Sequence, residues 1–141
     1  MKNVKKGHKH PIVCLDAGHY GKYNRSPVVL EYYESDMNWK LHTMLKKELE
    51  AKIEKAEEER TAQDKDLALV ARGKASEGCD LFLSTHSNAA GSESVDRPVG
   101  IYLVDDKSTD IDELSKEVAV LLSEVVAKVM ETKDKAQQYS K

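Results

Sequence analysis

Two stretches that end alike constrain the fold more than anything else in the sequence. Asp80-Leu-Phe-Leu-Ser-Thr-His-Ser-Asn-Ala-Ala90 is a short apolar run that turns polar and delivers His86 and Asn88. Pro11-Ile-Val-Cys-Leu-Asp-Ala-Gly-His19 is again an apolar run, and it ends in an acid, a glycine and a histidine. Both patterns are typical of buried strands that end in the polar residues of a functional site. In a parallel sheet the carboxyl ends of the strands lie at the same edge. We therefore expect His19 and His86 to lie close together.

Segments of helical periodicity separate these strands. A first helix is expected from about Ser35 to Glu59, because the charged run 51–60 is rich in helix formers, and a second from Thr61 to Glu77. A third strand over Val99–Val104 precedes a last helix over Asp112–Met130. The expected apolar stripes are Met37, Leu41, Leu45 and Leu49 on the first helix and Leu114, Val118, Leu121, Val125 and Val129 on the last.

The sequence thus predicts an α/β fold: a single-domain sheet, mostly parallel, with helices packed on both faces. With 141 residues, the chain is expected to be one domain over 1–141, with a flexible basic tail at 1–10 and a polar tail at 132–141 that frays. Gly18 and Gly21 are expected to give the loop after the first strand its unusual backbone conformations. Cys14 and Cys79 lack the paired spacing of a metal or redox motif and are expected to be buried free thiols.

Composition excludes several classes of partner. A hydrophobic fraction of 40%, a charged fraction of 33% and a formal net charge of −3 describe a globular chain without a basic surface for nucleic acid or an apolar stretch for membrane insertion. The basic start is followed by His10 and Pro11 instead of an apolar segment, so no signal peptide is expected.

The two histidines suggest a metal. A catalytic zinc needs three protein ligands, usually imidazole nitrogens and a carboxylate oxygen, and an open position for water. Glu34, at the expected start of a helix, is a plausible third ligand because it can be aimed back at the carboxyl edge of the sheet. The competing interpretation is that His19 and His86 are hydrogen-bonded loop residues without a metal.

Several motifs, taken in order, resemble those of the zinc-dependent N-acetylmuramoyl-L-alanine amidases of the type 3 family, found in bacterial cell-wall hydrolases and phage endolysins. The resemblance covers about Ile12 to Val129, and its motifs are Asp16-Ala-Gly-His-Tyr-Gly-Lys22, Tyr33-Glu-Ser-Asp-Met-Asn38, Arg72 and Leu83-Ser-Thr-His-Ser-Asn-Ala89.

The resemblance implies that His19, Glu34 and His86 bind Zn²⁺, which would polarise an amide carbonyl and activate a water. The substrate it implies is peptidoglycan, cut between the lactyl group of N-acetylmuramic acid and L-alanine. Asn88 would then support substrate binding, although a turn-forming role is an equal alternative. The protein would be made in the cytoplasm and act on the cell wall after export or release.

Two departures from the family pattern stand out. The family's second strand is expected to be replaced by the charged helical run, and the family's second glutamate, the general base on a late apolar strand, has no evident counterpart, so no catalytic base is assigned. The expected activity is therefore weak or lost, and the alternative is a non-catalytic zinc-binding or minimal scaffold derivative of an amidase domain. Missing strands would leave an open sheet edge that favours self-association.

Overall fold

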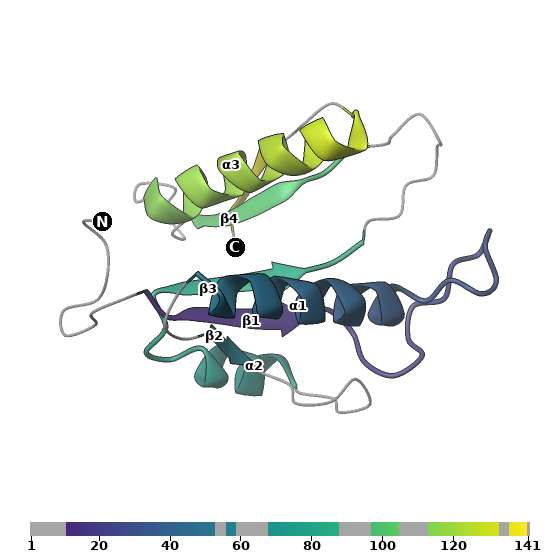
Figure 1. The fold of residues 1–141 in the computed structure, drawn as a ribbon, viewed down its shortest axis with the longest axis horizontal. Helices are drawn as coiled ribbons and strands as arrows, with labels where there is room; N and C mark the ends of the chain where they lie inside the picture. Colours follow the sequence, from purple (N-terminus) through teal and green to yellow (C-terminus); the bar gives the residue numbers. More distant parts are fainter. Residues whose placement is uncertain are drawn as a thin grey trace. The chain divides into compact units, whose positions relative to one another are not determined.

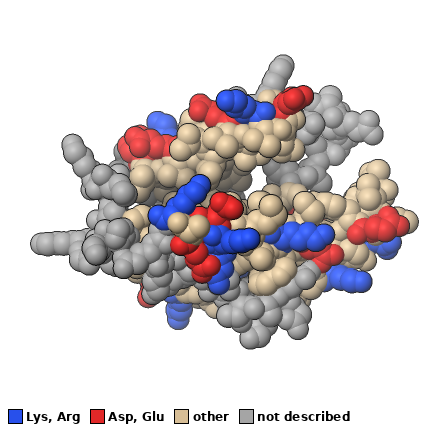
Figure 2. All heavy atoms as spheres, in the orientation of Figure 1, with Lys and Arg blue, Asp and Glu red and all other residues tan. Residues whose placement is uncertain are grey.

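A computed structural model of the chain describes residues 11–52, 56–58, 68–87, 97–104, 113–132 and 136–140. The chain divides into two compact units, Met1–Asn88 and Ala89–Lys141, and each is described here by itself. The expectation of a single domain stays a prediction. Among the described residues, no helix is both long and apolar enough to cross a bilayer. On the face drawn in Figure 2, acidic and basic side chains are interspersed.

The first unit is built on a parallel sheet in the order β2-β1-β3 (Figure 1). The central strand, β1 (Val13–Ala17), is buried at all five positions and pairs with β2 (Ala56–Glu58) on one side and β3 (Leu81–Thr85) on the other. Because β1 and β3 run in register from Val13↔Leu81 to Ala17↔Thr85, the loops that follow them leave the sheet at the same edge. The predicted parallel α/β sheet is confirmed.

Helix α1 (Glu34–Glu50) lies along this sheet, and the shorter α2 (Leu69–Ala75) precedes β3 (Figure 1). Helix α2 falls inside the predicted span of the second helix, whose residues 61–67 lie outside the described part of the chain. The expectation that helices cover both faces of the sheet stays a prediction.

The predicted continuation of the first helix to Glu59 is wrong. Helix α1 ends at Glu50, and Ala56–Glu58 forms the short strand β2, in parallel register with β1 from Val13↔Ala56 to Leu15↔Glu58. The backbone of β1 needs a hydrogen-bonding partner on this side, and that demand outweighs the helix propensity of a charged segment. An edge strand also accepts charged residues that a central strand would not. The expectation that a helical run stands in place of a strand here is therefore wrong as well.

The inner face of α1 is also not the predicted one. Its buried residues are polar, Glu34, Ser35, Asn38 and His42. Of the expected stripe, Met37 and Leu41 are exposed, and Leu45 and Leu49 are half-buried. The periodicity located the helix, but hydrogen bonds between its first turns and the neighbouring loop determine which side faces inward.

The second unit is a β-α-β arrangement in which two strands are parallel neighbours. Strand β4 (Gly100–Val104) is followed by α3 (Glu113–Met130) and β5 (Ala136–Ser140), which pairs with β4 from Gly100↔Ala136 to Val104↔Ser140. The expectation that 132–141 frays is thus wrong for Ala136–Ser140, whereas 133–135 and 141 lie outside the described residues. Backbone pairing requires no apolar side chain, so a polar segment completes the ladder.

Helix α3 packs through small residues and not through the predicted apolar stripe. Ala119, Ser123 and Ala127 are buried, while Leu121, Val125 and Val129 are exposed. The close approach is visible at Gly100, where an added Cβ would lie 2.3 Å from the carbonyl oxygen of Ala119. Small side chains on the helix and a glycine on the strand allow this contact.

Candidate metal centre

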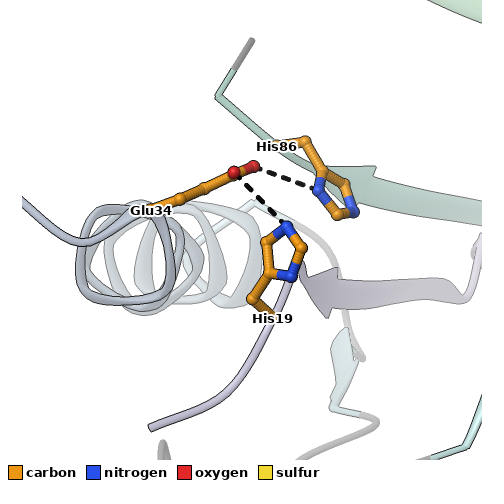
Figure 3. A group of neighbouring side chains, drawn as sticks. All are labelled: His19, Glu34 and His86. Carbon is orange, nitrogen blue, oxygen red and sulfur yellow. Dashed lines mark hydrogen bonds and ion pairs between the residues drawn. The ribbon is translucent and has the colours of Figure 1, made fainter. Parts of the chain in front are cut away.

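The three predicted ligands come from three different elements and meet at one point (Figure 3). His19 lies in the loop after β1, Glu34 is the first residue of α1, and His86 directly follows β3. The Nε2 atom of His19 is 3.3 Å from Oε2 of Glu34, and Nδ1 of His86 is 3.2 Å from Oε1 of Glu34. The imidazole rings are 5.0 Å apart between centroids and nearly perpendicular, at 82°.

This donor set fits zinc. Two imidazole nitrogens and one carboxylate oxygen are the ligands of an open catalytic zinc site, and here such atoms lie within 4.8 Å of one another. Ligands bound about 2.1 Å from a tetrahedral ion lie about 3.4 Å apart. The two histidines contact Glu34 at 3.2 and 3.3 Å, each through a different carboxylate oxygen.

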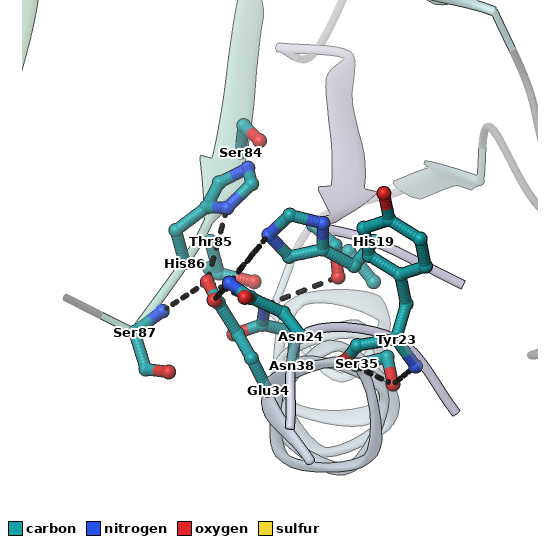
Figure 4. Close-up of polar contacts among 12 residues, drawn as sticks. His19, Tyr23, Asn24, Glu34, Ser35, Asn38, Ser84, Thr85, His86 and Ser87 are labelled. Atoms are coloured by element: carbon teal, nitrogen blue, oxygen red, sulfur yellow. Dashed lines mark hydrogen bonds and ion pairs between the residues drawn. The ribbon is translucent and has the colours of Figure 1, made fainter. Parts of the chain in front are cut away.

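Glu34 is held as a buried anion (Figure 4). Its Oε1 accepts hydrogen bonds from the Ser87 backbone N–H at 2.8 Å and from Asn38 Nδ2 at 3.5 Å, and its Oε2 accepts one from Asn24 Nδ2. Burial on its own would raise the pKa of Glu34, but these hydrogen bonds together with the charge of His19 outweigh it and hold the pKa below its ordinary value. Glu34 is therefore ionised at neutral pH, as a metal ligand must be.

The loop that carries His19 has an uncommon backbone. His19 has φ of 62° and Asn24 has φ of 58°, both in the left-handed region that few residues other than glycine adopt. The hydroxyl of buried Ser35 stabilises this loop, because it donates to the Gly21 carbonyl at 2.6 Å and accepts from the Tyr23 N–H at 3.0 Å. A strained backbone kept in place by a buried group is frequent at functional sites.

Gly18 serves the site by its size. A Cβ at this position would lie 2.4 to 2.6 Å from three atoms of the His86 ring, so only glycine leaves room for the imidazole. Its backbone N–H donates to the Thr85 carbonyl at 2.9 Å, and its carbonyl accepts from Asn38 Nδ2 at 3.1 Å. The expected reason for Gly18, an unusual backbone conformation, is wrong, whereas Gly21 does have a positive φ of 52°.

A buried ion pair fixes the two strand ends beneath the site. Asp16 of β1 accepts hydrogen bonds from Arg72 of α2 at 2.5 Å and from the Ser84 hydroxyl of β3 at 2.6 Å. Asp16 is 4% exposed, so its charge needs both partners. This gives Arg72, which the sequence singled out only by resemblance, a structural role.

Asn88 lies outside the described residues. Sequence analysis did not identify four residues that support Glu34 and its loop: Asn24, Ser35, Asn38 and Ser87. Asn38 could have been found, since it stands four residues after Glu34 and therefore on the same side of a helix. Cys14 and Cys79 are buried free thiols, as expected.

Two solved structures share the fold of this chain. An N-acetylmuramoyl-L-alanine amidase from Clostridium difficile 630 superposes with a TM-score of 0.77 at 20% identity, over 94% of this chain and 72% of its own. The catalytic domain of CwlV, an N-acetylmuramoyl-L-alanine amidase from Bacillus (Paenibacillus) polymyxa var. colistinus, gives 0.72 at 22% identity, over 92% and 70%. At such identities the likeness concerns the fold.

A search of curated protein sequences gave no match. The family model described as N-acetylmuramoyl-L-alanine amidase matches residues 13–141, nearly the whole chain and every element described above. The chain therefore belongs to the N-acetylmuramoyl-L-alanine amidase family.

Proposed function

We propose that this chain uses Zn²⁺, held by His19, Glu34 and His86, to hydrolyse the amide between the lactyl group of N-acetylmuramic acid and L-alanine in peptidoglycan, acting on the wall after export or release. The observation that carries the proposal is the meeting of these three side chains at the carboxyl edge of a parallel sheet, with both histidine-to-glutamate contacts at 3.2 to 3.3 Å.

The residues of the chain prepare the site for a cation. Glu34 brings a negative charge whose donors, Asn24, Asn38 and the Ser87 N–H, fix its orientation. Zinc bound there would supply a Lewis acid for the amide carbonyl and a water made acidic enough to attack at neutral pH. The side chain of His86 is half-exposed, so solvent reaches this ligand position.

The general base stays unassigned. Among the described residues the buried acids are Asp16 and Glu34, and Asp16 is engaged by Arg72 and Ser84. This observation favours a second candidate function, a zinc-binding domain without catalysis, because losing a general base typically costs about two to four powers of ten in rate.

The test is hydrolysis of purified peptidoglycan by the zinc-loaded chain. Cleavage of the proposed bond releases new amino termini that belong only to alanine, which separates an amidase from a glycosidase, which releases reducing ends, and from a peptidase acting further along the stem. Chelation should abolish the release and added zinc should restore it.

His86→Ala is the matched loss-of-ligand variant, and the double variant His8→Ala/His10→Ala is its control, because it removes the two histidines near the start of the sequence and keeps His19, Glu34 and His86. Zinc bound without hydrolysis would support the non-catalytic candidate. Hydrolysis that survives His86→Ala would contradict both functions.

A further inference from the structure

Three aromatic rings form a row that starts at the candidate metal centre. The ring of Tyr23 stacks on His19 with 5.5 Å between centroids and an interplanar angle of 24°, as Figure 4 shows for these two side chains. The ring of Tyr20 stacks on Tyr23 at 5.6 Å and 17°. Tyr20 is 37% exposed and Tyr23 is 54% exposed, so the row presents aromatic surface to solvent.

The backbone of the loop holds the two tyrosine rings in place, although both rings are exposed. The backbone on both sides of Tyr20 is in the left-handed region, at His19 and Gly21, and the buried Ser35 hydroxyl bonds to Gly21 and to Tyr23. Two exposed tyrosines held in this way lose little conformational freedom when a ligand covers them, because their positions are already fixed.

The position of the row matches one half of the proposed substrate. If the amide carbonyl lies at the metal, the lactyl group joins it directly to the muramic acid ring, which must then lie within a few ångströms of His19. Tyr23 lies within this reach, because its ring stacks directly on His19, and Tyr20 extends the row by stacking on Tyr23.

The chemistry of the row favours a sugar over a peptide. A pyranose ring has an apolar face of C–H groups, which packs on an aromatic face, and hydroxyls at its rim, which the two phenol groups can bind as donors or acceptors. An extended peptide binds instead through backbone hydrogen bonds, which ring faces do not offer.

We infer that Tyr20 and Tyr23 form a saccharide subsite that receives the muramic acid ring, so that the enzyme recognises the glycan half of its substrate. The inference rests on the proposed function for the identity of the sugar. Tyr20 then binds the substrate. Tyr23 binds the substrate as well, and its stacking contact with His19 orients the imidazole ring.

Binding of the disaccharide N-acetylglucosaminyl-N-acetylmuramic acid, which has no stem peptide, tests the subsite without requiring hydrolysis. NMR titration of the chain should show the aromatic signals of Tyr20 and Tyr23 shifting with the disaccharide. Tyr20→Ala should weaken binding about five- to tenfold, the loss expected for one stacking contact, and Tyr20→Phe should stay within about twofold of the wild type. Val28→Ala, at an exposed loop position of the same unit, is the control and should change nothing.

A second arm uses the lactoyl-L-alanyl peptide, which carries the scissile amide but no sugar ring. Tyr20→Ala should leave binding of this probe unchanged. Equal disaccharide binding by wild type and Tyr20→Ala would overturn the inference, as would an equal loss for both probes. If the wild type binds the disaccharide through these tyrosines but neither binds zinc nor hydrolyses peptidoglycan, the proposed function fails and the subsite stands.

Discussion

At the scale of single residues, the candidate metal centre depends on groups other than the three proposed ligands. Asn24, Asn38 and the Ser87 N–H hold Glu34, Ser35 holds the loop, and Gly18 leaves space for His86. Such outer contacts orient the ligands and tune affinity.

Gly18→Ala is expected to weaken zinc binding without changing any ligand. The added methyl group would collide with the His86 ring, and the ring, which is half-exposed, would be pushed away from Glu34. The dissociation constant for zinc should rise about ten- to a hundredfold, measured by titration against a competing chelator. Gly73→Ala is the control, because a Cβ there meets no atom within 4 Å. Unchanged zinc affinity in Gly18→Ala would contradict the described packing.

The stability of the zinc-free chain should depend on pH through Glu34. Its pKa is lowered in the folded state from the ordinary value of 4.5, so its stabilising contribution is fully present above that value and is lost as the pH falls through the lower folded pKa. Urea unfolding of wild type and Glu34→Gln should therefore differ most near neutral pH and converge in acid. A difference that stays constant down to about pH 3 would show that the carboxylate is not stabilised in this way.

The residue types of the site could be predicted from the sequence, but their supports could not. Histidines and an acid at strand and helix ends are a local signal, and His19, Glu34 and His86 do converge. The contacts from Asn24 and Ser87 join residues that are 10 and 53 positions from Glu34, and no local pattern contains such information.

At the scale of elements, the sequence indicated which strands lie parallel but not which helix faces are buried. The strands β1 and β3 could be predicted because apolar runs ending in polar residues are distinctive. Helix α1 buries polar residues that bond to the loop, and α3 buries alanine and serine. Strands β2 and β5 were missed because their polar sequences are ordered by backbone pairing, which leaves no apolar pattern.

Gly100→Ala is expected to destabilise the β4-α3-β5 unit. Its Cβ would lie 2.3 Å from a backbone oxygen of α3, and a backbone atom cannot rotate away as a side chain can. A loss of about 1 to 3 kcal/mol in the free energy of unfolding is expected, observed as faster hydrogen exchange in β4 and α3. Gly73→Ala should be neutral or slightly stabilising, because alanine favours a helix. Equal exchange rates in Gly100→Ala and wild type would refute the close contact.

At the scale of the whole molecule, family membership extends over both units, since the family model matches residues 13–141. The expected single domain requires that the two units unfold cooperatively. The expected self-association also stays a prediction, to be checked by sedimentation.

A single domain should unfold in one transition that zinc shifts as a whole. Trp39, the one tryptophan of the chain, lies in α1 and reports on the first unit, while far-ultraviolet circular dichroism reports on the helices of both. Free zinc at a hundred times its dissociation constant should add about 2.7 kcal/mol, and both signals should move together. If part of the dichroism signal is lost in a separate transition whose midpoint does not change with zinc, the single domain is contradicted.

X-ray absorption at the zinc edge would show whether His19, Glu34 and His86 hold one zinc ion. We expect one zinc per chain with two imidazole nitrogens and oxygen ligands at about 2.0 to 2.2 Å, lost in His86→Ala and kept in His8→Ala/His10→Ala. Sulfur ligands from the cysteines, zinc that persists in His86→Ala, or no bound zinc at all would contradict it.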